Sequence, residues 1–95
     1  MWAQYLPQIE ERVALLEAAA QALAADRLSK EQHEAAKDAA HKLAGVLGTF
    51  GLTRGTDLAR ELEIMYSRED GPGLALAARL TSVAAELRAL VESRK

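Results

Sequence analysis

Apolar residues recur every three or four positions through most of this 95-residue chain. This spacing places them on one face of an α-helix, and no stretch shows the strict alternation of a half-buried β-strand. The pattern predicts four helices, at about residues 8–25, 30–50, 54–67 and 74–93. Because the connections are short, consecutive helices should be antiparallel neighbours. We therefore expect an all-α fold, an antiparallel up-down-up-down four-helix bundle, with residues 1–95 forming one domain.

Several residues mark the ends of these helices. Ser29 and Gln32 in "SKEQ" have the spacing of a capping box, in which each side chain bonds to the other residue's backbone N–H. Gly51 suits the left-handed residue that often follows a helix. The segment "EDGPG" at residues 69–73 is the clearest break in the chain.

The first residues require a separate interpretation. Pro7 is well suited to the first turn of a helix, where its missing N–H has no helical partner. Trp2, Tyr5 and Leu6 precede it. We therefore expect a short N-terminal capping segment, separate from the first long helix and placed over one end of the bundle.

The composition excludes several classes of protein. The chain has no cysteine, so it has neither a disulfide framework nor a thiolate zinc site. Its formal net charge of -2 gives no electrostatic footprint for nucleic acid. No apolar run approaches the roughly 20 residues that span a bilayer, and the start lacks the plan of a signal peptide. We expect a cytoplasmic protein that binds neither nucleic acid nor a membrane.

The second predicted helix contains a histidine beside two glycines. At about 100° per residue, its apolar residues fall within one inward-facing stripe: Ala36, Ala40, Leu43, Leu47 and Phe50. His41 lies about 140° from the centre of that stripe, so it should point into solvent. Gly45 and Gly48 lie within about 40° of the direction of His41. The glycines therefore clear the surface around an exposed imidazole.

Two interpretations of this arrangement compete. Interior glycines commonly allow two helices to pack closely, but these glycines face away from the predicted core. Each also costs roughly 1 kcal/mol relative to alanine in a helix. A bare outward face suits a second molecule that approaches the histidine closely. Neutral imidazole is available as a nucleophile at physiological pH, so we interpret His41 as a nucleophile served by a docking partner.

Other chemistries fit the sequence less well. Asp38 and His41 have the i, i+3 spacing of a di-iron ligand pair, but such pairs occur twice and point into a bundle. The chain contains no HExxH motif and no serine or cysteine paired with a base. His33 lies on the flank of the apolar stripe, so we interpret it as a boundary residue. We therefore expect no metal site.

The residues around His41, and those of the next predicted helix, resemble a known family. "AHKLAGVLGTFGL", followed by "LARELE", is similar to the histidine phosphotransfer (HPt) domains of bacterial two-component phosphorelays. Seven residues fall on matching positions of the family pattern: His41, Leu43, Gly45, Phe50, Gly51, Leu62 and Glu63. The specific part of the resemblance covers the second and third helices.

The resemblance implies a phosphoryl carrier without kinase activity of its own. His41 would accept a phosphoryl group from the aspartate of a receiver domain, or from a hybrid histidine kinase, and pass it to the aspartate of a response-regulator receiver. The receiver would bring Mg²⁺, so this chain needs no cofactor. We expect it to be a monomer whose partner docks over Asp38, Ala44, Gly45 and Gly48.

One residue departs from the family pattern. The family usually has lysine three residues after the histidine, beside the phosphoryl group, where this chain has Ala44. Lys37, about 40° around the helix from His41, is the best local substitute, and Lys42 is a weaker one. The departure leaves open an alternative function, a degenerate bundle that binds receivers or other partners without carrying phosphate. A kinase dimerisation domain fits less well, because one chain already supplies four helices.

Overall fold

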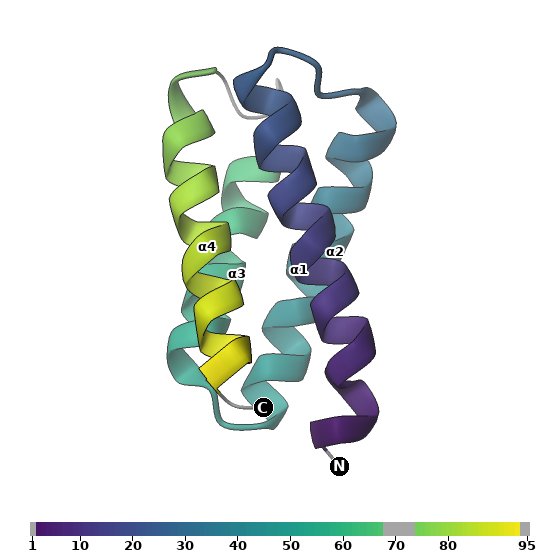
Figure 1. Cartoon of the computed structure of the whole chain (residues 1–95), viewed down its shortest axis with the longest axis vertical. Helices are drawn as coiled ribbons and strands as arrows, with labels where there is room; N and C mark the ends of the chain where they lie inside the picture. Colours follow the sequence, from purple (N-terminus) through teal and green to yellow (C-terminus); the bar gives the residue numbers. More distant parts are fainter. Residues whose placement is uncertain (1, 68–73, 94–95) are drawn as a thin grey trace.

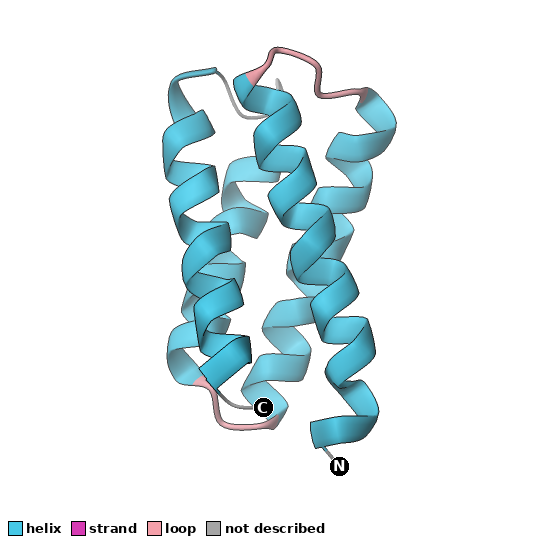
Figure 2. Cartoon of the chain, viewed as in Figure 1, coloured by secondary structure: helices cyan, strands magenta, loops and turns pink. Residues whose placement is uncertain are grey.

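The computed structural model describes residues 2–67 and 74–93, and its regular structure there is entirely helical (Figures 1 and 2). Its elements are α1 (Trp2–Ala24), α2 (Lys30–Thr49), α3 (Thr53–Tyr66), the 3₁₀ turn η1 (Leu74–Leu76) and α4 (Ala77–Ser93). In Figure 1, α1 and α3 run in one direction along the bundle, and α2 and α4 run in the other. The described residues thus form the expected antiparallel four-helix bundle.

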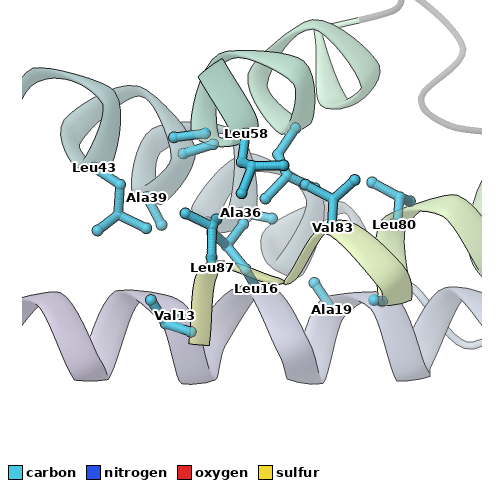
Figure 3. Close-up of a cluster of buried hydrophobic side chains, with 14 of the residues drawn as sticks. Val13, Leu16, Ala19, Ala36, Ala39, Leu43, Leu58, Leu80, Val83 and Leu87 are labelled. Carbon is cyan, nitrogen blue, oxygen red and sulfur yellow. The ribbon is translucent and has the colours of Figure 1, made fainter. Parts of the chain in front are cut away.

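The helices enclose one apolar core. Helix α2 packs beside α1 and α3, and α4 packs beside the same two helices. Figure 3 shows buried side chains from all four helices meeting between them, among them Val13, Leu16, Ala36, Leu43, Leu58, Leu80, Val83 and Leu87. No charged side chain is buried among the described residues. The core therefore holds α2 by one face and leaves its opposite face to solvent.

Both ends of α2 are closed as the sequence predicts. The Ser29 hydroxyl accepts a hydrogen bond from the backbone N–H of Gln32 at 3.0 Å, and the Gln32 side chain accepts one from the N–H of Ser29 at 3.4 Å. At the other end, Gly51 has a φ of 73°. The N–H of Leu52 bonds to the Leu47 carbonyl at 2.9 Å, which is the 6→1 bond of a Schellman motif. These caps fix the length of the helix that carries His41.

The prediction of a short N-terminal capping segment, separate from the first long helix, is wrong. Helix α1 begins at Trp2 and continues through Pro7, although an interior proline costs about 3 kcal/mol in a helix. Packing offsets this cost: the Tyr5 ring meets the Phe50 ring edge-on, with centroids 5.6 Å apart, and Leu6 packs against the core. The side chain of Trp2 and the predicted break at 69–73 lie outside the described residues.

The predicted inward stripe of α2 is confirmed except at its last residue. Its alanine and leucine members are each at most 1% exposed: Ala36, Ala40, Leu43 and Leu47. Phe50 is instead the half-buried C-cap residue of α2 and packs against Tyr5. The stripe fails there because the helix ends at Thr49, so the angle per residue no longer applies.

Candidate functional site

His41 lies near the middle of α2 and points away from the core. Its neighbours Ala40 and Leu43 are both 0% exposed, whereas the His41 side chain is 72% exposed. The core face of α2 thus sets the direction of the imidazole. This confirms the outward orientation predicted from the helical wheel.

A carboxylate from the next helix holds the imidazole. Nδ1 of His41 lies 2.7 Å from Oε2 of Glu63, and the Glu63 side chain is 29% exposed. Glu63 belongs to α3, which packs against α2. The sequence matched Glu63 to a family position but did not predict this contact, because the contact depends on how α3 lies along α2.

The hydrogen bond determines which ring nitrogen is free. An ionised carboxylate only accepts hydrogen bonds, so Nδ1 of His41 carries the proton and its N–H donates a hydrogen bond to Glu63. In the neutral ring, Nε2 then holds the lone pair. Nε2 has no hydrogen-bond partner among the described residues. The arrangement presents an unprotonated, exposed nitrogen, which is the form of imidazole that acts as a nucleophile.

The imidazole borders a shallow hollow on the surface of α2 and α3. The hollow has a volume of about 330 Å³ and is lined by Glu34, Lys37, Asp38, His41 and Glu63. Four of these side chains come from residues 34–41 of α2, and Glu63 comes from α3. The site is therefore strongly charged and open to a large partner.

The two candidate lysines have different surroundings. Nζ of Lys42 forms an ion pair with Oδ2 of Asp38 at 3.0 Å, and Lys42 does not line the hollow beside His41. Lys37 lines that hollow directly. The geometry therefore favours Lys37 over Lys42 as the cation next to a group on His41.

The glycines beside His41 are exposed, as the sequence predicts. A Cβ atom added at Gly45 would meet nothing within 4 Å, and one added at Gly48 would meet Oγ1 of Thr56 at 3.5 Å, an ordinary contact. By contrast, a Cβ at the buried Gly55 of α3 would lie 3.0 Å from Cδ1 of Leu47. Close helix packing thus explains Gly55 and does not explain Gly45.

A second hollow adjoins Gly45 on the side of α1. It has a volume of about 510 Å³, and its lining comes from α1, the C-terminal half of α2 and the C-cap residue of α2: Tyr5, Gln8, Arg12, Lys42, Gly45, Val46, Thr49 and Phe50. The sequence did not single out Tyr5, Gln8 or Arg12 for this surface. The sequence gives little indication of this surface, because only the packing of α1 on α2 brings these three residues beside Gly45.

Ala44 does not lie on the open surface, although the sequence analysis placed it in the docking surface. Its side chain is 8% exposed, and its carbonyl accepts a hydrogen bond from the Thr56 hydroxyl at 3.4 Å. The residue lies against α3, so its methyl group is not part of the open surface formed by Asp38, Gly45 and Gly48. Packing of α3 on this side of α2 covers the position.

The remaining histidine is part of the fold. His33 is half-buried, and its Nε2 donates a hydrogen bond to the backbone carbonyl of Tyr66 at the end of α3. This agrees with its interpretation as a boundary residue. Within residues 2–67 and 74–93, no group of three or more histidine, cysteine or acidic side chains could hold a metal ion. No helix in that part of the chain is long and apolar enough to cross a membrane.

The sequence of this chain is similar to those of known proteins. A curated relative, Protein RcaC from Microchaete diplosiphon, is 39% identical over 62 residues, which is 65% of this chain and 10% of that protein. No solved structure matches the chain significantly. The sequence model of the Hpt domain matches residues 1–93. The chain therefore belongs to the Hpt domain family.

Proposed function

We propose that this chain carries a phosphoryl group on Nε2 of His41, between the aspartate of a receiver domain or a kinase and the aspartate of another receiver. The main support is the 2.7 Å hydrogen bond from Nδ1 to Glu63 on a ring that is 72% exposed. In the neutral ring, this bond leaves the Nε2 lone pair free and accessible. Family membership supports the same chemistry.

The transfer step requires no residue of this chain to shuttle a proton. The Nε2 lone pair forms the N–P bond while the bond from phosphorus to the donor aspartate oxygen breaks, and that bonding pair stays on the carboxylate. The proton on Nδ1 remains there, so the ring becomes an imidazolium. The carboxylate of Glu63 stabilises this charge, as an acidic partner does for a catalytic histidine elsewhere. Donation to the next aspartate reverses these events.

The partner completes the site. Phosphoryl transfer depends on in-line placement and on neutralising charge, and we propose that the receiver supplies Mg²⁺ while Lys37 supplies a nearby cation. Gly45 and Gly48 let the receiver approach Nε2. We further propose that the chain acts as a monomer in the cytoplasm. Its own four helices already enclose the core, and the absence of cysteine fits a reducing compartment.

Labelling by a phosphorylated receiver tests this function. Wild-type protein should gain a phosphate that is lost in acid and stable in base, and His41→Gln should gain none. The matched control is His33→Gln, which removes the other histidine of the chain and should be labelled at His41. Labelling of His41→Gln at the wild-type level would reject the proposal.

A second candidate is binding without phosphate transfer, and Ala44 favours it because the family lysine is missing there. In that case, calorimetry would show wild-type and His41→Gln proteins binding the receiver with equal affinity. Neither protein would gain label. A labelled wild-type protein excludes this candidate, since it demonstrates transfer.

A further inference from the structure

The hollow beside His41 carries an excess of negative charge. In the described part of the chain, its lining includes the carboxylates of Glu34, Asp38 and Glu63 but only one lysine, Lys37. A phosphoryl group on His41 would add roughly two more negative charges. The carboxylate of Glu63 is paired with Nδ1 of the ring, whereas those of Glu34 and Asp38 are like charges that repel a phosphoryl group. These two carboxylates therefore raise the free energy of the phosphorylated form relative to the free imidazole.

Asp38 affects this balance in two ways. It lies three residues before His41, and side chains at this spacing on a helix are neighbours, about 5–6 Å apart at Cβ. Its carboxylate also holds Nζ of Lys42 at 3.0 Å. The lysine that follows His41 in the sequence is therefore engaged by Asp38. Replacing Asp38 would remove one repulsive charge and release one attractive charge.

We propose that Asp38 sets the phosphoryl-transfer equilibrium of this carrier, so that the group is passed on to a receiver rather than retained on His41. This inference rests on the proposed function, because it concerns phosphorylated His41. In the favoured direction the N–P bond breaks, its electron pair returns to Nε2, and phosphorus bonds to an oxygen of the receiver aspartate. The proton on Nδ1 stays with the ring beside Glu63.

A role in docking alone gives a different result from a role in the equilibrium. A residue that only helps the receiver to bind changes the forward and reverse rates equally, so the final distribution of phosphate is unchanged. A residue that raises the free energy of phosphorylated His41 changes that distribution. The measurement is therefore made at equilibrium, at protein concentrations below the dissociation constant of the complex.

The experiment uses the full chain, a receiver domain with Mg²⁺, and radioactive phosphate supplied through the receiver. Asp38→Asn keeps the size of the side chain and removes its charge, and Asp38 is 60% exposed, so the fold should persist. We expect the ratio of labelled carrier to labelled receiver to rise about two- to fivefold at low salt, as for one charge screened by water. The gain should shrink at high salt.

Two further variants complete the design. Asp26→Asn is the matched control, because Asp26 is an exposed aspartate outside the hollow, and it should keep the wild-type ratio. Adding Lys42→Ala to Asp38→Asn should remove part of the gain, because the released lysine contributes to it. A wild-type ratio in Asp38→Asn, with label present on His41, overturns this inference and leaves the carrier function intact. A wild-type protein without label on His41 overturns both.

Discussion

Replacement of Glu63 by glutamine tests the role of the bond that holds the imidazole. Glu63→Gln keeps the shape of the side chain but removes the charge that faces Nδ1 of His41 at 2.7 Å. A hydrogen bond to a charged group contributes about 1.5–3 kcal/mol. Here the two side chains are 72% and 29% exposed, and solvent screening reduces the expected loss to about 1–2 kcal/mol.

That loss should appear mainly as a slower reaction. A change of 1.36 kcal/mol in the barrier is tenfold in rate, so Glu63→Gln should transfer phosphate about five- to thirtyfold more slowly. Rapid-quench measurements with a phosphorylated receiver give the rate, and circular dichroism checks that the helices persist.

Glu61→Gln provides the control on the same helix. Glu61 forms an ion pair with Arg79 of α4 at 2.6 Å and lies outside the hollow of His41. The Glu61 variant should therefore transfer phosphate at the wild-type rate. If Glu63→Gln matched that rate while remaining folded, phosphoryl transfer would not depend on this carboxylate, which would refute the role assigned to Glu63.

Three further predictions concern the docking face, the nearby cation and the core. Gly45→Leu should keep or slightly raise helicity but slow transfer at least about tenfold, because misplaced reacting groups are costly; unchanged kinetics would remove the explanation of this glycine as a docking surface. Lys37→Ala should slow transfer about two- to tenfold relative to wild type, and more at low salt than at high salt. A Lys37→Ala rate equal to the wild-type rate at both salt concentrations would show that Lys37 does not support the phosphoryl group. Tyr66 is 1% exposed, and its hydroxyl has no hydrogen-bond partner among the described residues, so Tyr66→Phe should raise the free energy of unfolding by about 1 kcal/mol in urea titrations at pH 7. Burial raises the pKa of Tyr66 from 10.0 to about 12; the unfolded chain therefore loses this proton first, and wild-type stability should fall between pH 10 and 12 by up to about 3 kcal/mol more than that of Tyr66→Phe. Parallel loss of stability in both proteins would contradict the burial argument.

Much of this fold follows from short-range patterns in the sequence. Ser29 and Gln32 specify the start of α2, and Gly51 supplies the left-handed residue at its end. The apolar spacing identified the buried face of α2 and, by difference, the outward direction of His41. These features were predictable because each depends on residues within a few turns of one helix.

Features that depend on packing between helices were not predictable in the same way. Pro7 continues α1 because Tyr5 meets Phe50, a residue more than forty positions away. Ala44 is covered because α3 packs on that side of α2. In each case a contact between segments far apart in the sequence decided the outcome.

The candidate site combines both kinds of information. His41 and Gly45 could be placed from the wheel of one helix, and the open space at Gly45 confirms its outward position. The contact of Glu63 with Nδ1 of His41 required coordinates, because it joins two helices. Asp38 and Lys42 have the i, i+4 spacing of an ion pair on one helix, so the sequence alone could have predicted their contact.

The position of the phosphorus atom on the imidazole is the most direct test of the proposed carrier. Histidine labelled with ¹⁵N, phosphorylated through a receiver and examined by NMR, shows which ring nitrogen is bonded to phosphorus and which carries the proton. The structure predicts phosphorus on Nε2 of His41 and a proton on Nδ1, facing Glu63. Phosphorus on Nδ1 of His41, or on His33, would contradict the proposal.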